Sequence, residues 1–144
     1  MLSELVNNDE RLTLSNVVKY GASTTQSWTT DPKGSRMFAD FPDASLEAMA
    51  TQEILLQAHD WVVSTDTFVR TPLKDFFTLL ATDHKGEGED RVDFVMAMEA
   101  KEYPIYAVMF HPETANRHVT GNGTYLLAGK VNNAVTDEIN FRFS

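Results

Sequence analysis

The sequence contains no cysteine among its 144 residues. This absence excludes disulfide bonds, cysteine-ligated metal sites and a cysteine nucleophile supplied by the chain itself. The redox state of the compartment cannot be inferred either, because cysteine usage is the feature that separates secreted from cytosolic domains. Any reaction that needs a thiolate must therefore take it from outside this sequence.

Basic residues are also few: 12 Lys and Arg stand against 21 Asp and Glu, and the net charge is −9. Nucleic acids and anionic membranes are bound through Lys and Arg, which displace counterions from phosphates. We therefore expect neither as a partner. No apolar run approaches the roughly 20 residues that span a membrane. The length suffices for one globular domain, residues 1–144, with a hydrophobic core.

Closely spaced histidines are absent as well. The four histidines are His59, His84, His111 and His118. No pair has the short spacing of a helical zinc motif. We therefore expect neither a metal nor another cofactor.

The apolar run at residues 105–110 is the most informative stretch that is present, and it predicts a buried strand. The strand delivers His111 and Glu113 at its exit. Residues two apart in an extended chain point to the same side, so the two side chains are placed as a base and its orienting partner. Pro112 between them fixes its own φ and removes a backbone donor. The alternative is an ordinary strand end with solvated polar residues.

Apolar spacing predicts both helices and strands elsewhere. Asp43, followed by apolar residues at helical spacing, predicts a helix in residues 42–51. Thr71 and Pro72 predict the start of a second helix, with residues 76–80 as its buried face. Strands are predicted at residues 54–56, 61–63, 91–100 and 104–110, the last two as antiparallel neighbours, and residues 83–90 are predicted to form an exposed turn that contains His84.

Two further side chains allow alternative interpretations. Trp28 stands alone in the polar stretch 21–34, which predicts strand edge and loop. We interpret it as a packing residue rather than a surface on which a ligand stacks. Arg36 could attract a substrate carboxylate, although an arginine near a loop is more often a surface ion-pair partner.

The stretch from Phe94 to Glu113 resembles the signature region of the gamma-glutamyl hydrolases, a family of the class I glutamine-amidotransferase superfamily. In that family a strand ending in Met-Glu leads through a Tyr-Pro turn into a strand ending in Trp-His-Pro-Glu. The corresponding segments here are Met98-Glu99, Tyr103-Pro104 and Phe110-His111-Pro112-Glu113. Further segments similar to the family follow in the same order upstream, so that the likeness covers residues 1–113: Met1–Val6, Ser35–Phe38, Phe41-Pro42, Ala58–Trp61, Lys74–Phe77 and Leu79–Thr82.

This resemblance implies an α/β fold, namely the C-terminal part of a class I glutamine-amidotransferase-like, flavodoxin-like fold, with residues 1–144 as one partial domain. The complete fold has a central, mostly parallel sheet, and this part is expected to hold antiparallel strands at its edge. The nucleophilic cysteine of the family falls just before Met1. We therefore expect an N-terminal half, a partner chain or self-association to cover the open sheet.

The activity that the resemblance implies is hydrolysis of γ-glutamyl bonds in folylpoly-γ-glutamates, which are small anionic substrates. A cysteine attacks the amide carbonyl, and water releases the resulting acyl-enzyme. By the resemblance, His111 activates the thiol, Glu113 orients His111, and His59 assists. The alternative for His59 is a half-buried histidine satisfied by the backbone. The family suggests a lysosomal, vacuolar or secreted location, and no signal peptide is recognisable in this sequence.

The sequence also departs from the family. Met109-Phe110 replace the usual Gln-Trp, Ala100 and Ala107 replace glycines, and the aromatic-acidic-aromatic segment expected after Glu113 is absent. Without a cysteine, the chain is catalytically incomplete alone. One alternative is a catalytically dead structural or interaction module of a larger assembly. Another is a glutamine-amidotransferase domain that feeds ammonia to a synthase, although the Met-Glu and Tyr-Pro segments fit the hydrolases better.

Overall fold

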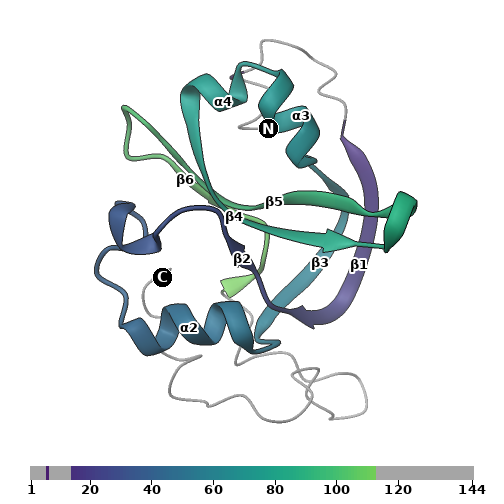
Figure 1. Cartoon of the computed structure of the whole chain (residues 1–144), viewed down its shortest axis with the longest axis horizontal. Helices are drawn as coiled ribbons and strands as arrows, with labels where there is room; N and C mark the ends of the chain where they lie inside the picture. The colour runs from purple at the N-terminus through teal and green to yellow at the C-terminus, as the bar shows by residue number, and fades with distance from the viewer. Residues whose placement is uncertain (1–5, 7–13, 113–144) are drawn as a thin grey trace.

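The computed structural model describes Val6 and residues 14–112. Figure 1 shows the strands in the middle of the molecule, with helices gathered towards two opposite ends. The elements are β1 (Ser15–Thr24), β2 (Ser27–Trp28), the 3-10 helix η1 (Pro32–Gly34), α2 (Asp43–Thr51), β3 (Leu55–Val62), α3 (Thr65–Arg70), α4 (Leu73–Phe76), β4 (Phe77–Lys85), the 3-10 helix η2 (Gly88–Asp90), β5 (Val92–Ala100) and β6 (Tyr106–Val108).

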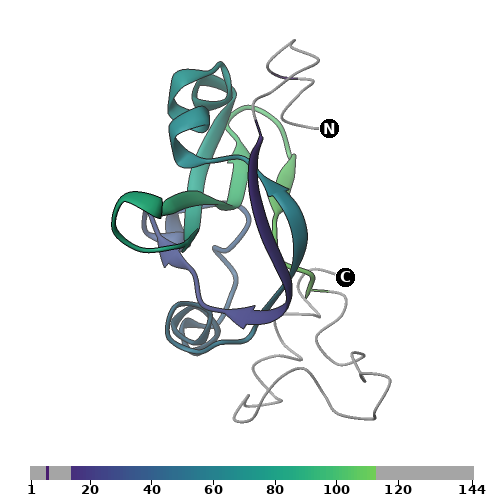
Figure 2. The same ribbon diagram turned by 90° about the vertical axis from the view of Figure 1, so that its right-hand side faces the viewer.

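The strands form two antiparallel sheets. β1 and β3 pair as a two-stranded ribbon, and the second sheet has the order β2-β4-β5-β6. Figures 1 and 2 agree that α3 and α4 lie together at one end, whereas α2 lies at the other. The described part is therefore a mixed α/β structure, as expected, and its strand pairs are antiparallel.

Two hydrophobic clusters hold the sheets and helices together. The larger cluster joins the β1–β3 ribbon to α2 and to the second sheet, and Phe94 on β5 is completely buried within it. The smaller cluster packs Phe68 and Leu73 of the α3–α4 pair against β4 and β5. Each helix thus buries one face against a sheet, which is how short helices gain most of their stability.

The helix predicted at residues 42–51 is confirmed as α2. Asp43, a possible N-cap from the sequence, is instead the first helical residue, and Pro42 is at the N-cap. The predicted antiparallel pairing of residues 91–100 with the strand before His111 is also confirmed. That strand is only Tyr106–Val108, however, and it is partly exposed rather than the buried strand predicted at residues 104–110. Instead of two strands around His59, however, the structure has the single strand β3. The predicted turn around His84 is shorter than expected: β4 continues through Lys85, and glycines with positive φ at positions 86 and 88 begin the turn only afterwards.

The helix predicted from Thr71-Pro72 is wrong beyond Phe76. α4 ends there, and Phe77 begins β4 opposite Ala100 of β5. The buried residues Phe77 and Leu80 are spaced like one face of a helix because the register shift between Leu79 and Ala81 adds one residue to β4. The bulge therefore produces a pattern of period three or four in an extended segment.

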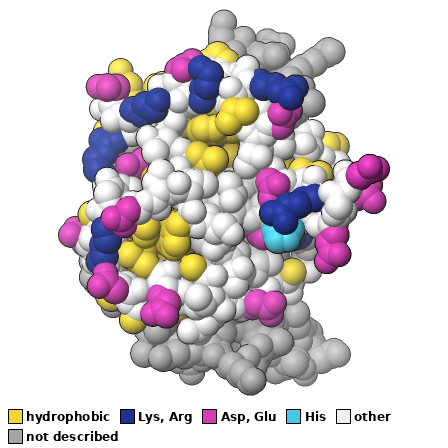
Figure 3. Space-filling view, in the orientation of Figure 1, with side chains coloured by type: hydrophobic (Ala, Val, Ile, Leu, Met, Phe, Trp, Pro, Cys, Tyr) yellow, Lys and Arg dark blue, Asp and Glu magenta, His cyan; other side chains and the backbone are white. Residues whose placement is uncertain are grey.

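Figure 3 shows Lys and Arg side chains interspersed with Asp and Glu on the visible face, without a continuous basic surface. No helix in the described part of the chain is long and apolar enough to cross a bilayer.

Candidate functional site

His111 lies just beyond β6, where the chain leaves the second sheet and meets the ribbon. Its backbone N–H donates to the carbonyl oxygen of Leu56 on β3, at 3.0 Å. The residue is half-buried. This hydrogen bond fixes His111 beside the start of β3, so the strand end that the sequence singled out is held against the ribbon. Its predicted partner Glu113 lies outside the described residues.

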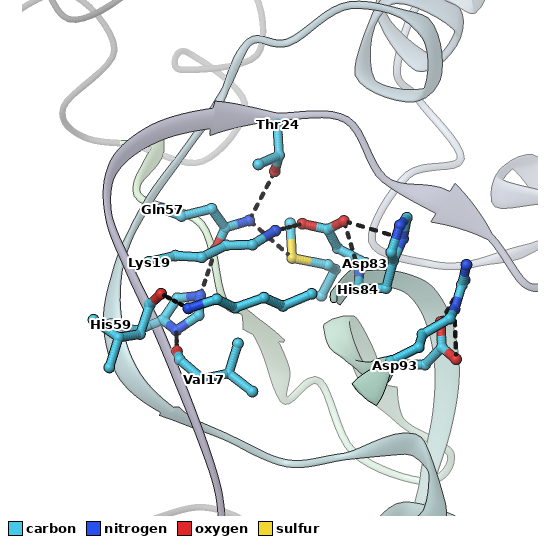
Figure 4. A network of polar contacts seen from close by, with 12 residues as sticks. Val17, Lys19, Thr24, Gln57, His59, Asp83, His84 and Asp93 are labelled. Atoms are coloured by element: carbon cyan, nitrogen blue, oxygen red, sulfur yellow. Dashed lines mark hydrogen bonds and ion pairs between the residues drawn. The ribbon is translucent and has the colours of Figure 1, made fainter. Parts of the chain in front are cut away.

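His59 lies on β3, three residues beyond Leu56, and it is half-buried with both ring nitrogens in contact with polar groups. Nδ1 is 3.0 Å from the carbonyl oxygen of Val17, and Nε2 is 2.8 Å from the side-chain oxygen of Gln57 (Figure 4). The ring also packs edge-on against Phe94, at 5.6 Å between centroids. These contacts match the alternative interpretation of His59, in which a half-buried ring is satisfied by its surroundings.

The charges around His59 favour its neutral form. Burial lowers the pKa of His59 below its ordinary value of 6.5, and the charges of Lys19 and His111 lower it further. The hydrogen bond to Val17 and the charge of Asp83 act in the opposite direction. The structure thus brings these two predicted residues close enough for a charge on His111 to lower the pKa of His59.

The orientation of the Gln57 amide is linked to the protonation of His59. With its oxygen towards Nε2, Gln57 requires a ring that donates from both nitrogens, which is the charged form. The lowered pKa of His59 favours instead a neutral ring that donates from Nδ1 to Val17 and accepts at Nε2 from the Gln57 amide nitrogen. Gln57 is fully buried, and its amide can turn its oxygen towards the hydroxyl of Thr24. Rotation of the Gln57 amide and protonation of the His59 ring are therefore coupled.

Stability should consequently fall on acidification through His59. The unfolded ring takes up a proton near its ordinary pKa of 6.5, whereas the folded ring resists until its lower pKa is reached. The contribution is complete above 6.5 and is lost as pH falls from 6.5 through the folded pKa. Urea unfolding between pH 7.5 and 5 should give a steeper loss for the native chain than for His59→Asn. Equal slopes for the two proteins would contradict this assignment.

Lys19 and Asp83 form an ion pair that joins the ribbon to the second sheet. Lys19 Nζ lies 2.7 Å from Asp83 Oδ2, and the side chains are only 13% and 10% exposed. The same ammonium group lies 5.2 Å from the centre of the Phe94 ring, an arrangement that is favourable for a cation. Figure 4 shows this pair beside Gln57 and His59. No sequence pattern predicts the pair, because the two residues are 64 positions apart.

Arg36 binds backbone carbonyl groups within the protein. Its guanidinium donates to the carbonyl oxygens of Ala100, Lys101 and Tyr103, in the connection between β5 and β6. In the reverse direction, the buried carboxylate of Glu99 accepts from the backbone N–H groups of Arg36 and Met37, at 3.3 and 3.0 Å. Hydrogen bonds in both directions thus connect residues 36–37 to residues 99–103, and the guanidinium of Arg36 bonds within the protein.

Trp28 is a packing residue, as the sequence suggested. Its indole packs edge-on against Phe38 at 5.0 Å, and Nε1 donates to the carbonyl oxygen of Leu46. Among the described residues, no cluster of three or more His, Asp or Glu side chains is arranged to hold a metal ion.

Curated relatives of this chain share one name. A rat gamma-glutamyl hydrolase is 38% identical over 115 residues, which cover 79% of this chain and 34% of the relative. A human gamma-glutamyl hydrolase is 37% identical over 82 residues, or 56% of this chain and 24% of the relative. A gamma-glutamyl hydrolase B from Dictyostelium discoideum is 32% identical over 80 residues, or 55% and 22%.

No protein-family model matches the sequence. The similarity to the relatives nevertheless extends across animals, Dictyostelium and plants. The chain spans only about a quarter to a third of the length of the relatives it matches. Over that part, the chain is similar to gamma-glutamyl hydrolases.

Proposed function

We propose that this chain supplies the histidine side of a gamma-glutamyl hydrolase active site. The observation that carries the proposal is His111, the half-buried residue of the His-Pro-Glu segment, which is fixed against β3 within the region related to these hydrolases. We also propose that the mixed α/β structure is part of a class I glutamine-amidotransferase-like fold. The substrates would be γ-glutamyl chains such as folylpoly-γ-glutamates.

In the proposed reaction, a thiolate attacks the carbonyl carbon of a γ-glutamyl amide. His111 takes the thiol proton and then gives it to the leaving amine, and water releases the acyl group from sulfur. Glu113 would hold the ring of His111 in the correct tautomer and orientation. His59 would assist as a neutral neighbour of His111, since burial lowers the pKa of His59.

The thiol must come from outside this sequence, which has no cysteine. The relatives are about three times as long as the matched segment. We propose that a polypeptide equivalent to the rest of a relative provides the cysteine, either on a partner chain or on a longer form of this one.

A second candidate is a catalytically dead interaction module. The contacts of His59 favour it, because both ring nitrogens are already used within the fold. The two candidates differ in whether His111 acts on a thiol.

The first test is purification of the protein from its native source, with peptide mapping and an assay for glutamate release from a poly-γ-glutamyl folate. The hydrolase proposal predicts that cysteine-containing peptides of gamma-glutamyl hydrolase type accompany this chain and that the preparation is active. An inactive preparation containing such peptides, or a preparation of this chain alone, would favour the interaction module.

A further inference from the structure

The outer edge of β6 carries backbone groups that point away from the sheet. Met109 donates to Met96, and Ala100 donates to the carbonyl of Ile105, both at 2.8 Å. These contacts mark the directly hydrogen-bonded pairs of an antiparallel ladder, in which such pairs alternate with non-bonded ones. The intervening pairs, Val108 with Ala97 and Tyr106 with Glu99, are therefore the non-bonded ones. The backbone N–H and C=O groups of Tyr106 and Val108 face away from β5.

β6 is the last strand of its sheet among the described residues. In residues 14–112, no backbone group bonds to Tyr106 or Val108 from the outer side. The side chain of Tyr106 is also 41% exposed. An edge of this kind is a template for an additional strand.

An apolar cavity lies beside this edge. Its volume is about 130 Å³, and its lining includes Val63, Met98, Ala107 and Val108. Val63 reaches the site because its carbonyl oxygen accepts from Val95 on β5, at 2.9 Å. Dry apolar cavities of roughly 150 Å³ hold molecules of the size of benzene. The cavity is therefore suited to one apolar side chain of about the size of Leu or Phe.

We infer that the outer edge of β6 and this cavity form the docking surface for a β-strand of the polypeptide that supplies the thiol. This inference rests on the proposed function and locates its partner. The strand would bond to the outward groups of Tyr106 and Val108 and place an apolar side chain in the cavity. His111 lies three residues beyond Val108, so a docked strand would pass within about 10 Å of its backbone.

Two observations select this occupant over a second copy of the chain. The relatives carry about two thirds of their length beyond the segment that this chain matches, which is enough to provide further strands. Each copy has a net charge of −9, and self-association would bring two such charges together.

Site-specific photo-crosslinking tests the inference. The photoreactive residue p-benzoylphenylalanine would replace Tyr106 in the full chain, expressed in its native host, and the products would be mapped by mass spectrometry. The inference predicts a cross-link to a cysteine-containing sequence of gamma-glutamyl hydrolase type. The same residue at Val69, which is 53% exposed on α3, should give no such product. A cross-link to a second copy of this chain, to an unrelated protein or to nothing would overturn the inference.

Proline variants then test the backbone contacts. Val108→Pro removes an outward N–H and spares the bonds to β5, so it should weaken partner binding at least tenfold with little change in Tm. Tyr106→Pro is a second variant of the same kind. Ala107→Pro removes an inward N–H and should lower Tm instead. Unchanged binding by both outward variants would overturn the inference, whereas normal binding by the native chain without hydrolysis would overturn only the proposed function.

Discussion

Substituting His111 by asparagine is expected to reduce γ-glutamyl hydrolysis by the completed enzyme by about ten-thousand-fold or more. Losses of this size follow when the general base of a nucleophile–His–carboxylate site is removed or misoriented. Asparagine keeps the backbone N–H that donates to Leu56, so the fold should survive. The measurement is kcat with a poly-γ-glutamyl folate, accompanied by a thermal unfolding curve.

The matched control is His59→Asn, which should cost far less activity. Both ring nitrogens of His59 bond within the fold, to Val17 and Gln57, so the ring is poorly placed to carry protons to a substrate. The substitution should mainly alter the pH dependence of stability. Comparable losses from the two substitutions would show that His59 takes part directly, and a small loss from His111→Asn would remove His111 from the mechanism.

Substituting Phe94 by alanine is expected to destabilise the fold by about 3–5 kcal/mol. Phe94 is completely buried, and its ring meets both His59 of the ribbon and the ammonium group of Lys19. Alanine would leave a cavity between the two sheets and would remove the aromatic surface under the Lys19–Asp83 pair. Urea unfolding followed by circular dichroism measures the loss.

The control for this prediction is Val69→Ala. Val69 is 53% exposed, and substitutions at such surface positions usually change stability by no more than about 0.5 kcal/mol. A loss below about 1 kcal/mol for Phe94→Ala would contradict the role of Phe94 as the residue that joins the two sheets.

Local patterns predicted those elements whose neighbours are close in sequence. α2 follows from Asp43 and the helical spacing after it, and the β5–β6 pair follows from two apolar runs joined by a short turn. The start of β4 at Phe77 was not predicted, because the bulge after Leu79 gives the buried residues of this strand the spacing of a helix. Pairing with β5 decided the structure of this segment, as tertiary context commonly does.

The site was predicted only in part for a similar reason. His111 was found because it ends a strand and belongs to an ordered series of family-like segments. Two further sets of contacts join residues more than 60 positions apart. They are the ion pair of Lys19 with Asp83 and the hydrogen bonds from Arg36 to backbone carbonyls. A carbonyl has no sequence signature, so only the fold reveals that Arg36 binds three of them.

The most direct measurement of the central claim is the rate at which the thiol of the completed enzyme is alkylated by iodoacetamide at neutral pH. This chain contains no cysteine, so the reactive thiol necessarily lies outside it. If His111 activates that thiol, alkylation should abolish hydrolysis, and it should be much slower in the His111→Asn protein because less thiolate is present. Equal alkylation rates in the two proteins, or hydrolysis that survives alkylation, would contradict the claim that this chain supplies the histidine of a gamma-glutamyl hydrolase site.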